Sequence, residues 1–385
     1  MKLMDLIFHE LKALVLNPVI ALTVFGGTVF YSFLYPLPYQ QQIPRDLPIA
    51  VVNLDASQLS YKLERMVDAS PNVKVVERLH SIDSAKRQFM QDKITGFVVI
   101  PEHFYKDVLL GKAPVLSYAG NASLLLVYGT VVEGLAQAGG TLAAEAKVAK
   151  YLQQGVPLVL ASEQYSAVKL NSKPTFNPRM GYIDYIVPAV FVLILQQTLL
   201  IAAGLLGATQ KNQTGYWNQV SRFELITVRM ALLSAVYYLL GMYYFGWSFS
   251  LHGVSVYAHI GQLLALMLPF FLCTIAIGIW LGNIASKREY VTTLVLMSSM
   301  PLLFISGVVW PTEALPQPLV LFAQLLPTAP AINGFLKLNQ MAADWWQVAP
   351  LWRQLWIQCL VWSAIAYLTY PKTSRSKHKK VPLAN

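Results

Sequence analysis

The residues that could carry chemistry in this sequence are few and scattered. The chain contains no Gly-x-x-x-x-Gly-Lys-Ser/Thr loop for nucleotide phosphates, no Gly-x-Ser-x-Gly nucleophile turn and no His-Glu-x-x-His zinc motif. Its six histidines are spread along the chain, and His9, for example, has no second metal ligand near it in the sequence. We therefore expect no catalytic residue, no metal site and no cofactor in this chain.

The long apolar stretches of the sequence contain no ionisable residue near their middles. The titratable residues closest to them lie near the predicted ends, where contact with water is cheap, namely Asp184, Arg229, His259 and Arg353. Proton-coupled carriers usually need Asp, Glu or His inside the bilayer. The sequence therefore disfavours proton coupling and predicts that another chain supplies the energy for any transport.

Three uncharged polar residues do fall inside apolar stretches: Gln196, Gln197 and Asn283. Polar groups in lipid seek hydrogen-bond partners on neighbouring helices. These three side chains therefore either join helices to one another or line a substrate path. A path with few charges suits hydrophobic or amphiphilic cargo of a drug-like or lipid-like kind.

The elements that would hold these residues are membrane helices. Of the 385 residues, 55% are hydrophobic and only 12% are charged, about half the charged fraction of a soluble domain. Apolar runs that suit a bilayer core about 30 Å thick lie at 18–35, 186–206, 228–247, 260–284, 290–309 and 350–370. The formal net charge of +10 lies beside these runs rather than on a basic soluble face, so we expect no binding of nucleic acid.

If the six apolar runs alternate across the membrane, positive charge separates between its two sides. Of the 14 Lys and Arg residues outside 37–182, twelve fall on one side, and only Lys337 and Arg353 fall on the other. The positive-inside rule then places both termini in the cytoplasm. We thus expect a polytopic α-helical protein with six transmembrane helices and an extracytoplasmic α/β domain between helices one and two.

The domain boundaries follow from this topology. The expected parts are a cytoplasmic interfacial helix over 1–17, the first span over 18–36, the extracytoplasmic domain over 37–182, the other spans over 183–370 and a basic cytoplasmic tail over 371–385. In the interfacial helix, Leu6 and Leu14 belong to the apolar face, and Glu10 belongs to the polar face.

The stretch 37–182 alternates short apolar strands with amphipathic helices. Strands are expected at 49–53, 73–76 and 94–100, and the β-α-β-α-β order predicts a small sheet covered by helices. A longer apolar stripe over 128–152 predicts a long helix, which packs either on its own domain or against a partner protein.

Prolines 311, 316, 327 and 330 follow the fifth apolar run and forbid one continuous helix near 305–345. Non-helical backbone at membrane depth is tolerated only where protein covers it or where it lines a water-filled cavity. We therefore expect a broken, partly re-entrant segment on the outer side. In that segment, Glu313 either caps a short helix or lines an exit.

This proline-rich segment resembles the signature of the ABC type-2 permease family. The matching residues are Ser306, Gly307, Pro311, Glu313, Pro316 and Pro327, where the last two follow leucines. Three further stretches are similar to the branch of that family with a large external domain: Ile-Ala-Val-Val-Asn-Leu-Asp-Ala-Ser at 49–57, Phe-Asn-Pro at 176–178 before Tyr-Ile-Val-Pro at 185–188, and Lys-Asn-Gln-Thr-Gly-Tyr-Trp-Asn-Gln-Val at 211–220. Together they cover essentially the whole chain.

The resemblance implies a non-catalytic half-transporter in the inner membrane of a bacterium, with its external domain in the periplasm. Together with the uncharged path, it leads us to expect multidrug or lipid efflux. Two such subunits, as a homodimer or as a heterodimer with a paralogous permease, would form the pathway, and separate ABC ATPase subunits would bind ATP and Mg. Some relatives also work beside a periplasmic adaptor (a membrane fusion protein) and an outer-membrane channel. The loop that contacts the ATPase would contain Lys211, Thr214, Gly215, Tyr216, Trp217 and Arg222.

Two alternatives belong to other classes of protein. In the first, the chain is a membrane-anchored sensor or scaffold, which would need only one anchor rather than six helices. In the second, it is a secondary carrier, which the missing intramembrane carboxylates argue against. Co-purification of an ATPase would separate the exporter from the scaffold, and transport driven by a proton gradient without ATP would identify the carrier.

Overall fold

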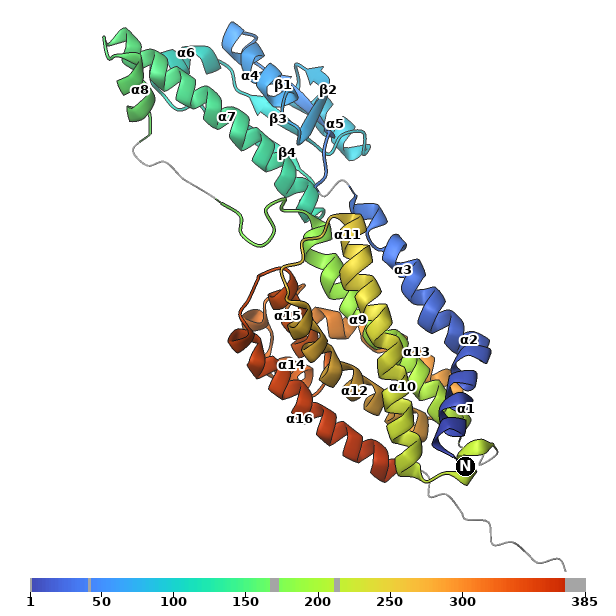
Figure 1. Ribbon diagram of the computed structural model, residues 1–385. Coiled ribbons are helices and arrows are strands. Elements are labelled where there is room, and N and C mark those ends of the chain that lie inside the picture. Colours follow the sequence, from blue (N-terminus) through green and yellow to red (C-terminus); the bar gives the residue numbers. More distant parts are fainter. Residues whose placement is uncertain (1, 41–42, 167–172, 211–214, 371–385) are drawn as a thin grey trace, which may run out of the picture. The chain divides into compact units, whose positions relative to one another are not determined.

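The computed structural model of the protein describes residues 2–40, 43–166, 173–210 and 215–370. They fold as two compact units (Figure 1): a helical unit, Met1–Gln40 with Pro174–Asn385, and a sheet unit, Gln41–Lys173. The sheet unit is one continuous stretch of chain, whereas the helical unit is built from the two stretches on either side of it. The predicted basic tail, 371–385, lies outside the described residues.

The helical unit begins with α1 (Leu3–Leu16), which ends where Asn17 precedes a proline. The Asn17 side chain accepts hydrogen bonds from the amides of Val19 and Ile20 and so starts the next helix. The later helices are α2 (Pro18–Ala21), the π-helix Leu22–Gly27, α3 (Thr28–Leu34), α9 (Tyr182–Thr209), α10 (Arg222–Met242), the π-helix Tyr243–Ser248, α11 (Phe249–His252), α12 (Ile260–Ile284), α13 (Arg288–Phe304), α14 (Gln317–Gln324), α15 (Thr328–Asn339) and α16 (Trp345–Thr369).

Four helical stretches among the described residues are long and apolar enough to cross a membrane: Pro18–Tyr39, Tyr182–Thr209, Arg222–His252 and Ile260–Ile284. A fifth results if α14 and α15, which are bent by 81° at their junction, are counted as one broken span. The other two stretches predicted to span fold as the helices α13 and α16, which do not belong to these four. The count of six transmembrane helices therefore stays a prediction.

Helix α9 forms the centre of the helical unit, because it is buried along nearly its whole length. It packs closely against α12 through glycines on both helices. A Cβ atom added to Gly278 would lie 2.9 Å from the carbonyl oxygen of Leu200, and one added to Gly282 would collide with the backbone of Gly204. Small residues that let two backbones approach are typical of helix contacts in membranes.

The sheet unit contains four strands in the order β2-β1-β3-β4, with β1 parallel to β2 and β3, and β4 antiparallel to β3. Its elements are β1 (Leu47–Asn53), α4 (Gln58–Asp68), β2 (Val73–Leu79), α5 (Ile82–Met90), β3 (Gly96–Ile100), α6 (Phe104–Leu109), β4 (Ser117–Gly120), α7 (Leu125–Gln153) and α8 (Leu158–Gln164). The three strands predicted from the sequence are confirmed, and β4 was not predicted.

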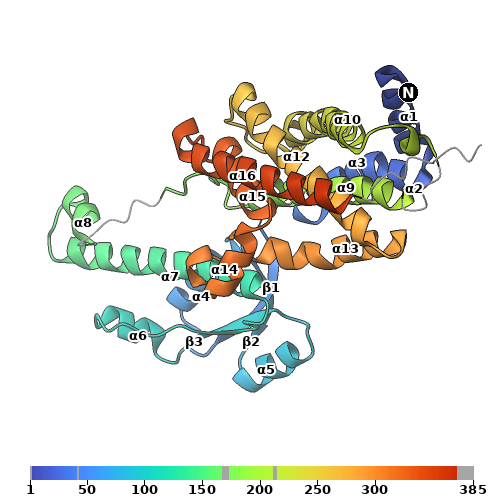
Figure 2. The same ribbon diagram turned by 90° about the horizontal axis from the view of Figure 1, so that it is seen from below.

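Both faces of the central strand are buried, because successive side chains of β1 point to opposite sides of the sheet. Ile49 and Val51 belong to a core completed by α4 and α7, whereas Ala50 and Val52 pack with α5. Figure 2 shows α5 and α7 on opposite sides of the sheet.

The long helix expected over 128–152 is α7, and part of its apolar stripe packs on its own sheet. Val131, Ala138 and Leu142 are buried in the core, with Leu135 packed beside them. Leu152, at the far end of the stripe, is exposed. The interpretation of the stripe as packing on its own domain is therefore confirmed from Val131 to Leu142.

Candidate functional site

The helical unit contains a fully buried ion pair between two helices that are distant in the sequence. The carboxylate of Glu10 in α1 is 0% exposed, and the guanidinium-bearing Arg229 in α10 is 1% exposed. Arg229 donates through Nε to Oε2 of Glu10 at 2.9 Å and through Nη2 to Oε1 at 2.7 Å. This two-pronged geometry is the strongest arrangement available to a guanidinium and a carboxylate.

Two expectations from the sequence are wrong here. Glu10 does not lie on a polar face of α1, and Arg229 is not hydrated at a helix end. Each charge satisfies the other, so that burial of the pair becomes possible where burial of either residue alone would be costly. A signal for this existed in the sequence, because Glu10 follows Leu6 and precedes Leu14 at four-residue intervals, which places all three on one helix face.

Three further side chains complete what we call the Glu10 cluster: Gln210 after α9, Tyr216 in the following loop and Tyr370 after α16. The Tyr216 hydroxyl donates to Oε1 of Glu10 at 2.9 Å. With its amide oxygen turned toward Arg229, Gln210 accepts from Nη1 at 3.0 Å and also bonds the Tyr370 hydroxyl. The cluster therefore joins α1, the loop after α9, α10 and the end of α16.

Burial, together with the nearby Glu10 carboxylate, raises the pKa of the Tyr216 hydroxyl well above its usual range. Tyr216 therefore keeps its proton at physiological pH and remains a donor to Glu10. As a result, the loop that contains Tyr216 is held to α1 by a charge-assisted hydrogen bond as well as by packing.

The residues next to Tyr216 in the loop pack closely on one another, and Tyr216 itself contacts α1. Gly215 has a φ of +124°, in the region that favours glycine, and a Cβ atom there would lie 2.8 Å from the Trp217 ring. The rings of His9 and Tyr216 have centroids 5.1 Å apart, and those of Tyr216 and Trp217 are 4.7 Å apart. The structure thus places Tyr216 against α1, with Gly215 and Trp217 packed beside it, whereas Lys211 and Thr214 lie outside the described residues.

Arg222, the last residue assigned to this loop, begins α10. Ser221 and Glu224 form a reciprocal capping box that fixes this helix start. The Arg222 guanidinium carbon lies 4.8 Å from the centre of the Tyr367 ring in α16, in a cation–π contact. The start of α10 is therefore connected both to its own cap and to the end of α16.

The proline-rich signature lies at the broken segment between α13 and α15. Pro311 precedes the short 3-10 turn Thr312–Ala314, and Pro316 and Pro327 precede α14 and α15, so each proline marks the start of a new element. Gly307 has a φ of +91°, and a Cβ atom there would collide with the Thr312 side chain. Glu313 lies exposed within the 3-10 turn.

Hydrogen bonds fasten this segment to its neighbours. Asn333 Nδ2 in α15 donates to the carbonyl oxygen of Ser306 at 2.8 Å. Ser306 itself is buried and bonds the carbonyl of Leu303 at 2.7 Å. The Tyr185 hydroxyl in α9 donates to the carbonyl of Val308. The backbone of 306–308 is therefore fastened to α9 and α15, whereas the residues at 310–314 are exposed.

Two of the three polar residues within apolar helices make helix-to-helix hydrogen bonds. Gln196 Nε2 in α9 donates to Thr328 Oγ1 at the start of α15, at 2.7 Å, and Asn283 Nδ2 in α12 donates to the carbonyl of Ala366 in α16, at 3.3 Å. Gln197 is half-buried on α9. Gln196 also keeps a buried amide oxygen without a partner among the described residues.

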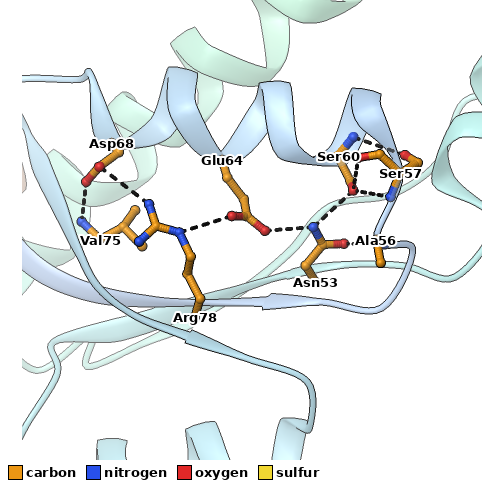
Figure 3. Close-up of polar contacts among 8 residues, drawn as sticks. All are labelled: Asn53, Ala56, Ser57, Ser60, Glu64, Asp68, Val75 and Arg78. Atoms are coloured by element: carbon orange, nitrogen blue, oxygen red, sulfur yellow. Dashed lines mark hydrogen bonds and ion pairs between the residues drawn. The ribbon is translucent and has the colours of Figure 1, made fainter.

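A second polar cluster fixes the turn from β1 to α4 in the sheet unit (Figure 3). Asn53 donates to Glu64 Oε1 at 2.6 Å and to Ser60 Oγ at 3.0 Å, and its own side-chain oxygen accepts from the amide of Ala56 at 3.0 Å. Arg78 in β2 reaches the other oxygen of Glu64 at 3.2 Å. The cluster explains why the stretch 49–57 ends its strand in Asn-Leu-Asp-Ala-Ser.

Comparison with known proteins adds one match. The model of a protein family described as "ABC-2 family transporter protein" matches residues 19–368, which is nearly the whole chain. No curated protein matches the chain.

Proposed function

The chain belongs to the ABC-2 family of transporter proteins, and from this premise we propose that it is the membrane-spanning subunit of an ATP-driven exporter. The family is one of membrane-embedded transport components, and it implies an ABC ATPase partner and a dimeric arrangement. In this proposal the chain hydrolyses no nucleotide itself. A separate ATPase subunit moves it, and the second permease in the dimer is either an identical chain or a paralogue.

The Glu10 cluster is the observation that carries the proposal. An ion pair buried at 0% and 1% exposure gives little net stability, because desolvation offsets its attraction. It does, however, hold α1, the loop residue Tyr216 and α10 in one arrangement. If the ATPase subunit moves this loop, the movement would therefore be transmitted to the transmembrane helix α10 and to the interfacial helix α1 together.

The distribution of basic residues supports placing this cluster on the cytoplasmic side. Figure 1 shows the N-terminus, the start of α10 and the end of α16 at one end of the helical unit, where the Glu10 cluster joins them. The start of α13 lies at the same end, because Arg288 lines one groove together with Asn17 and Pro18 at the end of α1. In this proposal that end faces the cytoplasm, both termini are inside, and the sheet unit lies in the periplasm of a bacterium.

The outward route in this proposal leads toward the broken segment. Its backbone, which is fastened to α9 and α15 at 306–308, and its exposed Glu313 suit an exit at the outer surface. Gln196, with one amide oxygen lacking a partner among the described residues, is the best candidate in this chain for a contact with cargo, and Gln197 and Asn283 are secondary ones. We expect hydrophobic or amphiphilic cargo. A periplasmic adaptor and an outer-membrane channel are the partners that would carry it onward.

The proposal is tested by purifying the tagged full-length chain from membranes of its own cells and identifying what co-purifies. An ABC ATPase is expected in a stable complex. In the same cells, Glu10→Gln should reduce ATP-dependent efflux of an amphiphilic dye, since Arg229 then loses its charged partner. The matched control is Asp5→Asn, which changes an exposed carboxyl group on the same helix and should leave efflux unchanged.

Three results would contradict the proposal. The first is the absence of an ATPase among the co-purifying proteins. The second is normal efflux in Glu10→Gln at normal protein level, which would remove the cluster from the coupling route. The third is an equal loss of efflux in Glu10→Gln and Asp5→Asn, which would attribute the effect to α1 in general.

A further inference from the structure

A groove opens on the sheet unit between α6, the loop after it and the second half of α7. Its volume is about 650 Å³, within the range of about 300–1,000 Å³ that is typical of small-molecule sites. Its floor is apolar, because Phe104 and Leu142 belong to the core and Leu116 is packed beside them. On the α7 side, Ala143 and Ala146 carry only methyl groups and leave the space open.

Three lysines line this apolar groove, Lys112, Lys147 and Lys150, and no carboxylate is among the described residues that line it. Lys112 is paired with Asp107 at 3.5 Å. Lys147 and Lys150 form no ion pair with any residue that the structure describes. The Lys150 ammonium lies over Gly111, where a Cβ atom would come within 2.8 Å of it.

We infer that this groove binds a free anionic amphiphile, such as a medium-chain carboxylate. The apolar body of the ligand would cover Phe104 and Leu142, and its anionic head would lie between the ammonium groups of Lys147 and Lys150. Burial of the tail is favourable in proportion to its apolar area, and the two unpaired ammonium groups favour a negative head over a neutral one.

The dimensions of the groove favour a small molecule over a protein. Fifteen residues line it, whereas a stable protein interface involves about 20–30 residues on each side. The inference goes beyond ATP-driven export, because binding to the sheet unit requires neither nucleotide nor an ATPase. It can therefore fail while the proposed exporter function stands, and the reverse also holds.

The test uses the full chain in nanodiscs of phosphatidylcholine and a dodecanoate that carries a photoreactive diazirine on its tail. Saturable labelling is expected on peptides from 104–116 and 139–154. The dodecanol analogue, which has the same tail without the charge, should bind about tenfold more weakly. If the dodecanol probe labels these peptides as strongly as the dodecanoate probe does, the inference is overturned.

Variants assign the binding to the groove. Lys147→Gln combined with Lys150→Gln should weaken labelling about tenfold, and Ala146→Phe should abolish it by filling the space. The control is Lys86→Gln, a change at an exposed lysine of α5 that should have no effect. Unchanged labelling in the double lysine variant would overturn the inference without depending on how Ala146→Phe folds. Displacement of the probe by phosphatidylglycerol added to the nanodiscs would likewise overturn it, in favour of a bilayer lipid.

Discussion

Glu10 and Arg229 form the most deeply buried ion pair among the described residues of the helical unit. Both are almost fully buried, and their bond is supported by Tyr216 and Gln210. Removal of one partner from such a pair leaves an unpaired buried charge, which typically costs about 3–5 kcal/mol. Removal of both partners leaves no such charge.

This asymmetry leads to a prediction for the thermal unfolding midpoint of the purified chain in one detergent. Arg229→Met alone should lower the midpoint strongly, whereas Glu10→Leu combined with Arg229→Met should recover a large part of the loss. Lys12→Met, a change at an exposed residue of α1, serves as the control and should have little effect. A double variant less stable than the single one would mean that the pair is not coupled as the structure shows.

Gly215 gives a second prediction at the same scale, because its φ of +124° and its approach to Trp217 both require glycine. Gly215→Ala should strain the loop by about 1–3 kcal/mol and reduce ATP-driven efflux while the protein remains in the membrane. Efflux is measured beside protein level in isolated membranes. Gly140→Ala, at a helical glycine of α7 with open space around it, should leave efflux intact. Normal efflux in Gly215→Ala would remove the loop conformation from the mechanism.

At the scale of elements, apolar runs and strand alternation were readable from the sequence, but contacts between elements were not. Strands were predicted at 49–53 and 73–76 because their apolar runs lie between turn residues and amphipathic helices. The strand Ser117–Gly120 was missed because it has only four residues, three of which (Ser117, Ala119 and Gly120) are small, and because it is paired on one side only. The Glu10 cluster was missed because glutamate is strongly hydrophilic and is therefore expected on the polar face of its helix. Its partner, Arg229, lies 219 residues away in the sequence, so the pairing was not visible there.

The contact between α9 and α12 gives a prediction for an element. Gly282→Val would place a branched side chain against the backbone of Gly204, where even a Cβ atom has no room. Two transmembrane helices would have to separate, so the variant should accumulate at a much lower level and unfold at a lower temperature. The control is Gly261→Ala on the same helix, where no atom lies within 4 Å of the added carbon. A Gly282→Val protein of normal stability would contradict this packing.

At the scale of the whole molecule, the proposed topology predicts which surfaces are reached from each side of the membrane. Both native cysteines, Cys273 and Cys359, are buried, so an introduced cysteine can be labelled selectively. In spheroplasts, a membrane-impermeant maleimide should label Lys86→Cys in the sheet unit and should not label Glu224→Cys at the start of α10. Lysis should make the second position reactive. Labelling of Glu224→Cys in intact spheroplasts would invert the topology.

In the proposed mechanism, a separate ATPase subunit drives transport. The clearest test uses inside-out membrane vesicles that contain the full chain and its co-purifying partner. Uptake of an amphiphilic dye should require ATP, and it should disappear when the ATPase partner carries a substitution that prevents ATP hydrolysis. A proton gradient without ATP should drive no uptake. Uptake driven by a proton gradient in liposomes that hold only the purified chain would contradict the proposed mechanism.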